Sequence, residues 1–277
     1  MTTTEQVNIR TPHGQPGLQL MKASFRTRSF ARHSHEGYGI GVIEQGALGF
    51  YYRGDNVVAP AGRINTVNPD EVHTGHSASE QGWTYRMFYC SPAFMQEMAS
   101  DIADKPVPLP LFTSGVIEDD QLAHQVQLTH AHLMDSSSPR LEQESLLLTL
   151  FSGLLTRHTY ASLPMVRAGN EPNRIGRFID YLEAQFAEDI DVGTLAAVAC
   201  LSPFHFIRVF SRQTGMTPHA WLMQLRVRKA VALLNRGVSI AEVALQTGFS
   251  DQSHLNRLFK RYLGYTPGQL RNSVQDT

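Results

Sequence analysis

The fold of the C-terminal part of the chain is decided by residues 239–267, which read SIAEVALQTGFSDQSHLNRLFKRYLGYTP. Residues 191–218, DVGTLAAVACLSPFHFIRVFSRQTGMTP, repeat this pattern, so that Leu201-Ser202 recurs 48 residues later as Phe249-Ser250. Two copies are too few to bury the core of a solenoid. Each copy instead predicts a short helix, a tight turn and a second helix, which is a helix-turn-helix.

Local signals mark where these helices begin and where the chain turns. Ser239 and Glu242 have the spacing of a capping box. Ser202 followed by Pro203 has the sequence of an N-cap and a first helical residue. Gly248 lies where the chain must turn sharply.

The second helix of each copy has an apolar and a polar face. The apolar faces consist of Phe206, Val209 and Phe210, and of Leu255, Leu258, Phe259 and Tyr262. The opposite faces carry Phe204, Ile207, Arg208, Ser211 and Arg212, and Gln252, Ser253, Asn256, Arg257 and Lys260. Arginine suits guanine edges, asparagine and glutamine suit adenine, and an exposed apolar side chain suits a thymine methyl group. These faces predict helices that read DNA, and the ordinary polar surface of a helical bundle is the alternative.

The segment between the two copies, residues 218–235, has the composition of a single helix. A rigid helix there would fix the distance between the two reading helices. For both to enter one face of a duplex, they must lie about one turn, roughly 34 Å, apart.

Charge is distributed unevenly along the chain. The 24 Lys and Arg residues and 25 Asp and Glu residues give a net charge of −1. Residues 202–277 hold ten of the basic and three of the acidic residues, a net +7, so residues 1–201 carry −8. A basic C-terminal part favours a polyanionic partner, and a solvated basic face without a partner is the alternative.

The overall composition is that of a globular protein with room for two domains. The chain has 277 residues, of which 42% are hydrophobic and 18% charged. Its two cysteines, Cys90 and Cys200, lie far apart, which fits a reducing compartment. Because the sequence has neither a run of about 18 apolar residues nor an apolar signal-peptide core near Met1, we expect a cytoplasmic protein without a membrane partner.

The first third of the chain has the pattern of short antiparallel strands. We expect them at Ile40–Ile43, Leu48–Tyr52, Val57–Val58, Ile64–Val67 and Tyr85–Tyr89. Glycine and proline residues between these segments, beginning with Gly46, predict turns. Strands at such short spacing favour an antiparallel barrel or a sandwich.

Helical periodicity begins near Ile117 and predicts helices at Ile117–Met134 and Leu141–Tyr160. The second helix has an apolar face wider than one sheet requires, so contact with a second subunit and plain core burial both remain open. The histidines of the first helix are expected at the surface or in an interface: His124, His130 and His132.

A segment without periodicity separates the two halves of the chain. Residues 161–172 contain Pro164, Gly169, Asn170 and Pro172, which is typical of a linker. We therefore expect an N-terminal domain over residues 1–160 and a C-terminal domain over residues 173–277.

The C-terminal part, residues 173–272, resembles the AraC/XylS-type transcription regulators. The residues that carry the resemblance are Leu201-Ser202-Pro203-Phe204-His205-Phe206, Phe210 and Gly215 in the first unit, and Ile240 to Ala244, Gly248 to Leu255, Phe259-Lys260 and Gly264 to Pro267 in the second. Leu255 is a mild departure, because an aromatic residue is usual there. The resemblance implies two helix-turn-helix units that are joined by a linker helix and bind adjacent major grooves.

The resemblance also implies roles for individual residues. Contacts with the bases fall on Phe204, Ile207, Arg208, Gln252, Ser253, Asn256 and Arg257. Contacts with phosphates fall on Ser202, Arg212, Lys260 and Arg261.

The N-terminal part resembles the cupin-type sensor barrel that is often fused to such domains. The carrying residues are His33-Ser34-His35, the strand Tyr38 to Ile43, Gly46, Gly54, Pro60-Ala61-Gly62 and Asn68 to His73. The resemblance implies a small-molecule pocket inside the barrel, with the helices that follow it used for dimerisation. The expected fold is therefore α+β multidomain: an N-terminal cupin-like β-barrel with two dimerisation helices, and a C-terminal all-α domain of tandem helix-turn-helix units.

Three interpretations of the barrel histidines compete. His33 and His35 point the same way on a strand, and with His73 they suit a zinc, iron or copper site. The fourth ligand of the cupin enzymes is in doubt, because Glu44 lies nine residues after His35, farther than the enzyme motif places it. Structural histidines are the second interpretation. We adopt the third, in which they line the pocket and hold the effector, and we predict no metal and no cofactor.

Two further residues complete the expected effector site. Arg86 and Tyr38 suit a carboxylate, which arginine binds in a bidentate pair. The effector would then be an amino acid or an organic acid.

The sequence thus predicts a transcription regulator and not an enzyme. An effector in the barrel of a homodimer would alter binding to double-stranded promoter DNA and activate transcription with RNA polymerase. The alternatives are a metal-dependent cupin enzyme tethered to DNA and a ligand-independent regulator whose barrel only dimerises.

Overall fold

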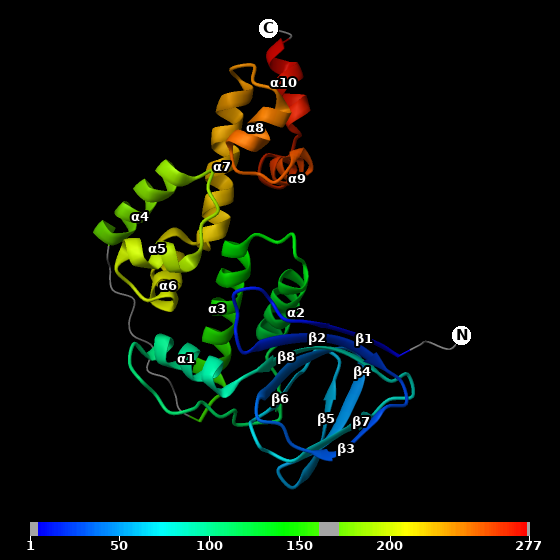
Figure 1. Ribbon diagram of the computed structural model, residues 1–277. Coiled ribbons are helices and arrows are strands. Elements are labelled where there is room, and N and C mark those ends of the chain that lie inside the picture. Colours follow the sequence, from blue (N-terminus) through cyan, green and yellow to red (C-terminus); the bar gives the residue numbers. More distant parts are fainter. Residues whose placement is uncertain (1–4, 161–171, 276–277) are drawn as a thin grey trace. The chain divides into compact units, whose positions relative to one another are not determined.

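The computed structural model describes residues 5–160 and 172–275 (Figure 1). Two compact units make up the chain, Met1–Pro139 with Leu146–Arg167, and Arg140–Ser145 with Ala168–Thr277. The expected N-terminal β domain and C-terminal helical domain are confirmed. The predicted linker, residues 161–172, lies outside the described residues except for Pro172, where a helix begins.

Antiparallel strands build the N-terminal domain and curve around a common interior (Figure 1). Their bounds are β1 (Gln6–Arg10), β2 (Leu18–Phe25), β3 (Ser29–His33), β4 (Tyr38–Tyr52), β5 (Asp55–Pro60), β6 (Ile64–Val67), β7 (His73–Ser77), β8 (Trp83–Cys90) and β9 (Val116–Ile117). The sheet runs in the order β1-β2-β8-β4-β6-β9, while β5 and β7 pair with β4, and β3 pairs with β7.

The long strand β4 passes through the turn that was expected at Gly46. Its first half pairs with β6 and β8 and its second half with β5 and β7. The register with β8 shifts between Ile43 and Gln45, and Gly46 has a φ of 70°. A Cβ at Gly46 would lie 1.9 Å from the carbonyl oxygen of Gly82. Glycine here therefore bends the strand from one wall of the barrel into the other instead of ending it.

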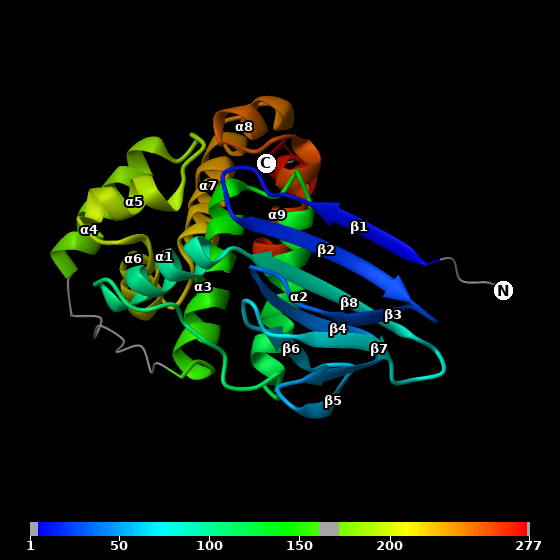
Figure 2. The same cartoon turned by 60° about the horizontal axis from the view of Figure 1, so that its bottom comes forward.

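Helices α1 (Pro92–Ala103), α2 (Asp120–Met134) and α3 (Arg140–Arg157) accompany the barrel (Figure 2). Phe151 of α3 meets Phe88 of β8 and Phe94 of α1 edge to face, with ring centroids 6.2 and 5.4 Å apart. Leu147, Phe151 and Leu154 are all buried. The apolar face of α3 is thus largely covered in a single chain, so its width does not point to a second subunit.

The C-terminal domain consists of helices. Their bounds are α4 (Pro172–Gln185), α5 (Val192–Ala199), α6 (Pro203–Thr214), α7 (Pro218–Leu234), α8 (Ile240–Gln246), α9 (Gln252–Leu263) and α10 (Pro267–Gln275). Within this domain α7 joins a group formed by α4, α5 and α6 to a group formed by α8, α9 and α10 (Figure 1). Phe178 of α4 packs against Phe206 and Phe210 of α6, with ring centroids 4.9 and 4.8 Å apart.

No single helix among the described residues has the length and apolar character needed to cross a membrane. One bent pair, Val192–Ala199 with Pro203–Thr214, meets both criteria only when the two helices are taken together.

A polar network fastens α2 to the outside of the barrel. His130 was expected at the surface or in an interface but is 0% exposed, because this side of α2 lies against β2, β4 and β8 within the same chain. Its Nε2 donates to the carbonyl oxygen of Met21 (3.2 Å), and its Nδ1 accepts from Nη1 of Arg86 (3.4 Å). Arg86 also forms an ion pair with Glu44. A neutral imidazole with its proton on Nε2 therefore satisfies both partners.

Protonation of His130 should destabilise the fold. Burial, and then the charge of Arg86, lower its pKa to about 4, below the value of about 6.5 in an unfolded chain. Its contribution to stability is thus complete above pH 6.5 and is lost as the pH falls toward 4. Between pH 6.5 and pH 4 the wild type loses unfolding free energy as His130 becomes protonated. Glutamine cannot be protonated, so we expect His130→Gln to lose about 3 kcal/mol less than the wild type over this range, measured by urea unfolding.

His124→Gln serves as the control for this prediction, because His124 is exposed on the same helix. It should retain the pH dependence of the wild type. Parallel pH profiles for the wild type and His130→Gln would contradict the role given to His130.

Candidate DNA-binding surface and effector pocket

The predicted N-caps of the helix-turn-helix units are present. The Ser202 hydroxyl accepts from the backbone N–H of His205 (3.4 Å), which opens α6. The Ser239 hydroxyl accepts from the N–H of Glu242 (3.3 Å), which opens α8. The Glu242 carboxylate, the expected second half of the capping box, accepts from the side-chain amide of Gln246.

Both units turn through left-handed backbone at equivalent positions of the repeat. Cys200 ends α5 with a φ of 54°, and Gly248 precedes α9 with a φ of 73°. Only the second position is crowded, since a Cβ at Gly248 would lie 2.5 Å from the carbonyl oxygen of Ala187 and 2.8 Å from Cζ of Arg226. The second unit therefore requires glycine both for its backbone angle and for space.

Arg226 of α7 ties both units to the same helix. Its Nε donates to the carbonyl oxygen of Phe186 (2.7 Å), its Nη2 to that of Glu188 (2.8 Å) and its Nη1 to that of Gly248 (2.6 Å). The first two oxygens lie between α4 and α5, and the third lies in the turn before α9. Arg226 is 7% exposed, and burial lowers its pKa to about 10, so the guanidinium stays charged at neutral pH.

The second reading helix, α9, presents its predicted contacts on one exposed face. Leu255, Leu258 and Phe259 are buried on the other side. The exposed residues are Gln252, Ser253, Asn256, Arg257, Lys260 and Arg261. Asp251 caps the helix, because its carboxylate accepts from the backbone N–H of His254 (2.7 Å).

The first reading helix, α6, differs from the prediction at two positions. Phe204 and Ile207 were expected to be exposed, but only 2% and 5% of their surface is accessible. Burial removes two large apolar side chains from water, which favours it by about 2 kcal/mol each. Arg208 is half-buried and Arg212 exposed, and burial, followed by the charge of Arg212, lowers the pKa of Arg208. Contact of Phe204 and Ile207 with bases stays a prediction.

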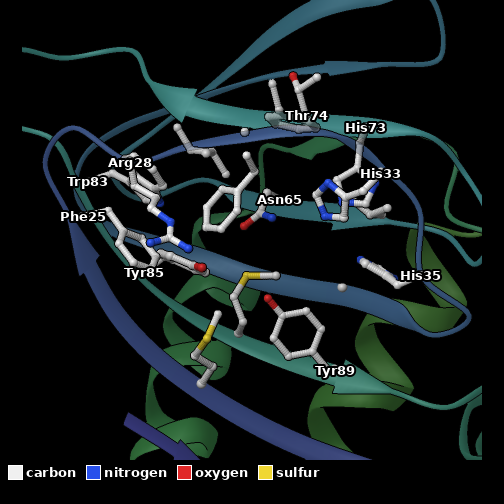
Figure 3. Close-up of a pocket in the computed structure, with 18 of the residues that line it drawn as sticks. Phe25, Arg28, His33, His35, Asn65, His73, Thr74, Trp83, Tyr85 and Tyr89 are labelled. Carbon is white, nitrogen blue, oxygen red and sulfur yellow. The ribbon is translucent and has the colours of Figure 1, made fainter. Parts of the chain in front are cut away.

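A cavity of about 390 Å³ lies inside the barrel (Figure 3). Eight of its twenty lining residues have aromatic or thioether side chains: Met21, Phe25, Phe30, Phe50, Trp83, Tyr85, Met87 and Tyr89. Arg28, Trp83, Phe25 and Tyr85 lie at one end, and the imidazole rings lie at the other end. This size is within the range of small-molecule sites.

Three of the five predicted effector residues line the cavity, namely His33, His35 and His73. Tyr38 does not, because its hydroxyl is buried on the opposite side of β4 and donates to the carbonyl oxygen of Pro110 (2.5 Å). Arg86 does not either, since it alternates with Tyr85 and Met87 along β8 and therefore faces α2. The prediction that Tyr38 and Arg86 form a carboxylate site in the cavity is therefore wrong.

The imidazole rings of His33, His35 and His73 lie close together. The centroid of His73 is 4.3 Å from that of His33 and 4.9 Å from that of His35. Burial, opposed by a hydrogen bond to Glu71 and aided by the two neighbouring histidines, lowers the pKa of His73. Within the described ranges, no set of three or more His, Cys, Asp or Glu side chains is arranged to hold a metal ion. Glu44, the doubtful fourth ligand, pairs with Arg86 outside the barrel.

The sequence reasoning missed most of the cavity wall. Alternation in β8 was the available signal, because every second residue from Trp83 to Tyr89 faces inward. Asn65 was also overlooked, although it lies within the predicted strand Ile64–Val67. It is 4% exposed and lies between the two ends of the cavity (Figure 3).

Family models and relatives match both parts of the chain. A model described as AraC-like ligand binding domain matches residues 15–151, and one described as helix-turn-helix domain matches residues 195–273. The HTH-type transcriptional regulator YbfI of Bacillus subtilis (strain 168) is 30% identical over 253 residues, 90% of each chain. The HTH-type transcriptional activator RhaS of Yersinia pseudotuberculosis serotype I (strain IP32953) is 25% identical over 253 residues, 89% of this chain and 90% of the relative.

Solved structures match as well. The DNA-binding domain of AdpA, solved in complex with a target DNA, is 34% identical and covers 37% of this chain and 94% of that chain, with a TM-score of 0.36. A structure of apo ToxT from Vibrio cholerae strain SCE256 is 11% identical and covers 93% of this chain and 98% of that chain, with a TM-score of 0.39.

Removal of the Arg226 guanidinium should loosen the helical domain. Arg226→Met leaves three partly buried carbonyl groups without this donor, and each costs about 1 kcal/mol. We expect the unfolding free energy to fall by about 3 kcal/mol or more, measured by urea unfolding with circular dichroism. Arg228→Met on the exposed side of α7 is the control and should cost less than about 1 kcal/mol. Equal losses in the two variants would contradict the role of Arg226.

Proposed function

Because the chain belongs to the AraC family of helix-turn-helix transcription regulators, we propose that a small molecule in the barrel cavity controls how its two reading helices bind promoter DNA. The family match supports DNA binding and an N-terminal ligand-binding domain for this chain. The observation that carries the proposal of control is the cavity of about 390 Å³ inside the N-terminal domain of a chain that also carries the DNA-binding units.

Sequence-specific reading falls first to α9. Arg257 suits the O6 and N7 acceptors of guanine, while Gln252 and Asn256 suit adenine. Ser253 can form a hydrogen bond with either base. All four side chains are exposed on the face opposite the buried leucines, which supports their entry into a major groove.

The first reading helix contributes Arg208, Phe204 and Ile207. Arg208 would bind a guanine edge, and the two apolar side chains would contact thymine methyl groups. Because Phe204 and Ile207 are buried in this structure, this face of α6 must become accessible before it enters a groove.

Phosphate contacts complete the proposed interface. Arg212, Lys260 and Arg261 are exposed near the ends of α6 and α9 and supply positive charge for the DNA backbone. The hydroxyl of Ser202 lies at the N-terminus of α6, where helix ends favour phosphate oxygens. These contacts fix the position of the reading helices and carry no sequence information by themselves.

Control by the effector requires two states of the protein with different affinities for it, because a ligand that binds both states equally shifts nothing. We propose that the protein is a cytoplasmic homodimer that associates through α2 and α3, with sides of these helices other than the buried face of Leu147, Phe151 and Leu154. Activation of transcription with RNA polymerase is the proposed outcome, and a relative named as an activator supports this direction. We propose an N-terminal domain that covers residues 1–160 and a C-terminal domain that covers residues 173–277.

The barrel serves as a sensor in this proposal, and two alternatives are open to test. A metal-dependent enzyme tethered to DNA would contain stoichiometric metal that is lost when His33 and His35 are replaced. A ligand-independent regulator would show no thermal shift with any member of a metabolite panel, whereas a sensor is stabilised by its ligand.

Substitutions in α9 should separate base contacts from phosphate contacts. Arg257→Ala is expected to weaken binding to the cognate promoter by about 1–3 kcal/mol and to relax the preference at one base pair. Lys260→Ala should weaken binding to all duplexes and lower the slope of log affinity against log salt by about one. Fluorescence anisotropy with cognate and scrambled duplexes across a salt series measures both effects.

Arg236→Ala is the matched control, because Arg236 is exposed outside both reading helices. It should leave the sequence preference and the salt slope unchanged. Binding that is independent of sequence, and unaffected by replacement of Arg208 and Arg257 together, would refute specific recognition by these helices.

A further inference from the structure

The cavity has an uneven distribution of hydrogen-bonding groups, and this points to the kind of molecule it holds. Figure 3 shows the three imidazole rings at one end and the Arg28 and Trp83 side chains at the other. Phe30, Phe50 and Tyr89 add further aromatic rings to the wall. The inference below rests on the proposed role of the cavity as an effector site.

Backbone contacts determine which nitrogen of each imidazole ring carries the proton. Nδ1 of His33 lies 2.8 Å from the carbonyl oxygen of Ala31. Nδ1 of His35 lies 2.7 Å from that of Gly37, and Nδ1 of His73 lies 2.9 Å from that of Glu71. A carbonyl oxygen only accepts, so in each neutral ring the proton sits on Nδ1 and donates to the backbone.

The histidine end of the cavity is therefore a cluster of acceptors. Each ring keeps the lone pair of its Nε2, and all three rings line the same cavity with centroids at most 6.2 Å apart. His73 is 8% exposed, so a partner for its Nε2 must come from inside the cavity. A group that donates hydrogen bonds satisfies this cluster, whereas a carboxylate, which only accepts, repels the lone pairs.

The opposite end offers donors. The indole N–H of Trp83 is buried and has no hydrogen-bond partner within the described part of the chain. The guanidinium of Arg28 stands over the ring of Phe30 with Cζ 5.5 Å from the centroid. At the exposed rim, Glu5 adds a negative charge to the positive charge of Arg28, so the rim does not select an ion of one sign.

We propose that the effector is a neutral, flat aromatic molecule with a hydroxyl or amine donor at one end and an acceptor at the other. The donor enters the acceptor cluster of His33, His35 and His73, where a hydroxyl gives its single hydrogen to one Nε2, and the acceptor faces Arg28 at the opposite end. The ring lies against the aromatic wall, and the side chain of Asn65, which has both a donor and an acceptor, holds the middle of the ligand. This assignment replaces the organic acid expected from Tyr38 and Arg86.

Three matched probes test the proposal on the full chain in the presence of EDTA. They are 4-hydroxyacetophenone, which has the donor and the acceptor, 4-methoxyacetophenone, which lacks the donor, and phenol, which lacks the acceptor. We expect calorimetry to show that the hydroxyl probe binds about tenfold more tightly than the methoxy probe and more tightly than phenol.

Substitution of the histidines places this preference in the cavity. His35→Phe and His73→Phe together should reduce the hydroxyl-to-methoxy preference at least about fivefold, because they leave His33 as the one remaining acceptor of this cluster. His76→Phe is the matched control, since His76 lies on β7 but outside the cavity wall, and it should retain the full preference. Circular dichroism identifies a variant that fails to fold, and His33→Phe at the exposed rim then takes its place.

Four outcomes would overturn the proposed ligand class. These are equal binding of the hydroxyl and methoxy probes, a preference that survives the histidine substitutions, no binding of any probe at its solubility limit, and stoichiometric metal whose removal abolishes binding. The expected ranking without any change in promoter affinity would instead contradict the proposed effector control, and the ligand class would stand.

Discussion

Three backbone carbonyl groups from both helix-turn-helix units converge on the guanidinium of Arg226, and the helical domain is organised around this convergence. A guanidinium presents its donors in a rigid plane, so the three acceptors are held at fixed directions from α7. The connection before α5 and the turn before α9 are thereby set against one helix. One side chain thus connects the segment before α5 and the turn before α9 to the same helix, α7.

The strand β8 places a similar constraint on the barrel. Tyr85 and Met87 form part of the cavity wall, while Arg86 between them contacts His130 of α2. Neighbouring side chains of a strand point to opposite faces, so the cavity wall and the contact with α2 share the backbone of β8. A ligand that shifts this backbone at Tyr85 or Met87 would also shift Arg86, whereas a change of side-chain rotamer alone would not.

Local signals allowed the helical domain to be predicted better than the barrel. N-caps such as Ser202 and Ser239 depend on residues within one turn, and they are visible in the sequence. The barrel depends on pairing between distant strands, so neither the passage of β4 through Gly46 nor the outward direction of Arg86 could be derived from local pattern. The burial of Phe204 was missed for a related reason, because a helical face shows which side chains point together but not what covers them.

The continuity of α7 has a consequence on the promoter side. The helix has 17 residues, and after its first residue it contains neither glycine nor proline, so it has no built-in hinge. Two reading helices would contact two short stretches of DNA, here called boxes. One base pair inserted between the two boxes would rotate one box by about 35° and shift it by about 3.4 Å relative to the other. A stiff connector cannot follow such a change. In the promoters that such a protein binds, base substitutions within a box would therefore be tolerated better than a change in the number of base pairs between the boxes.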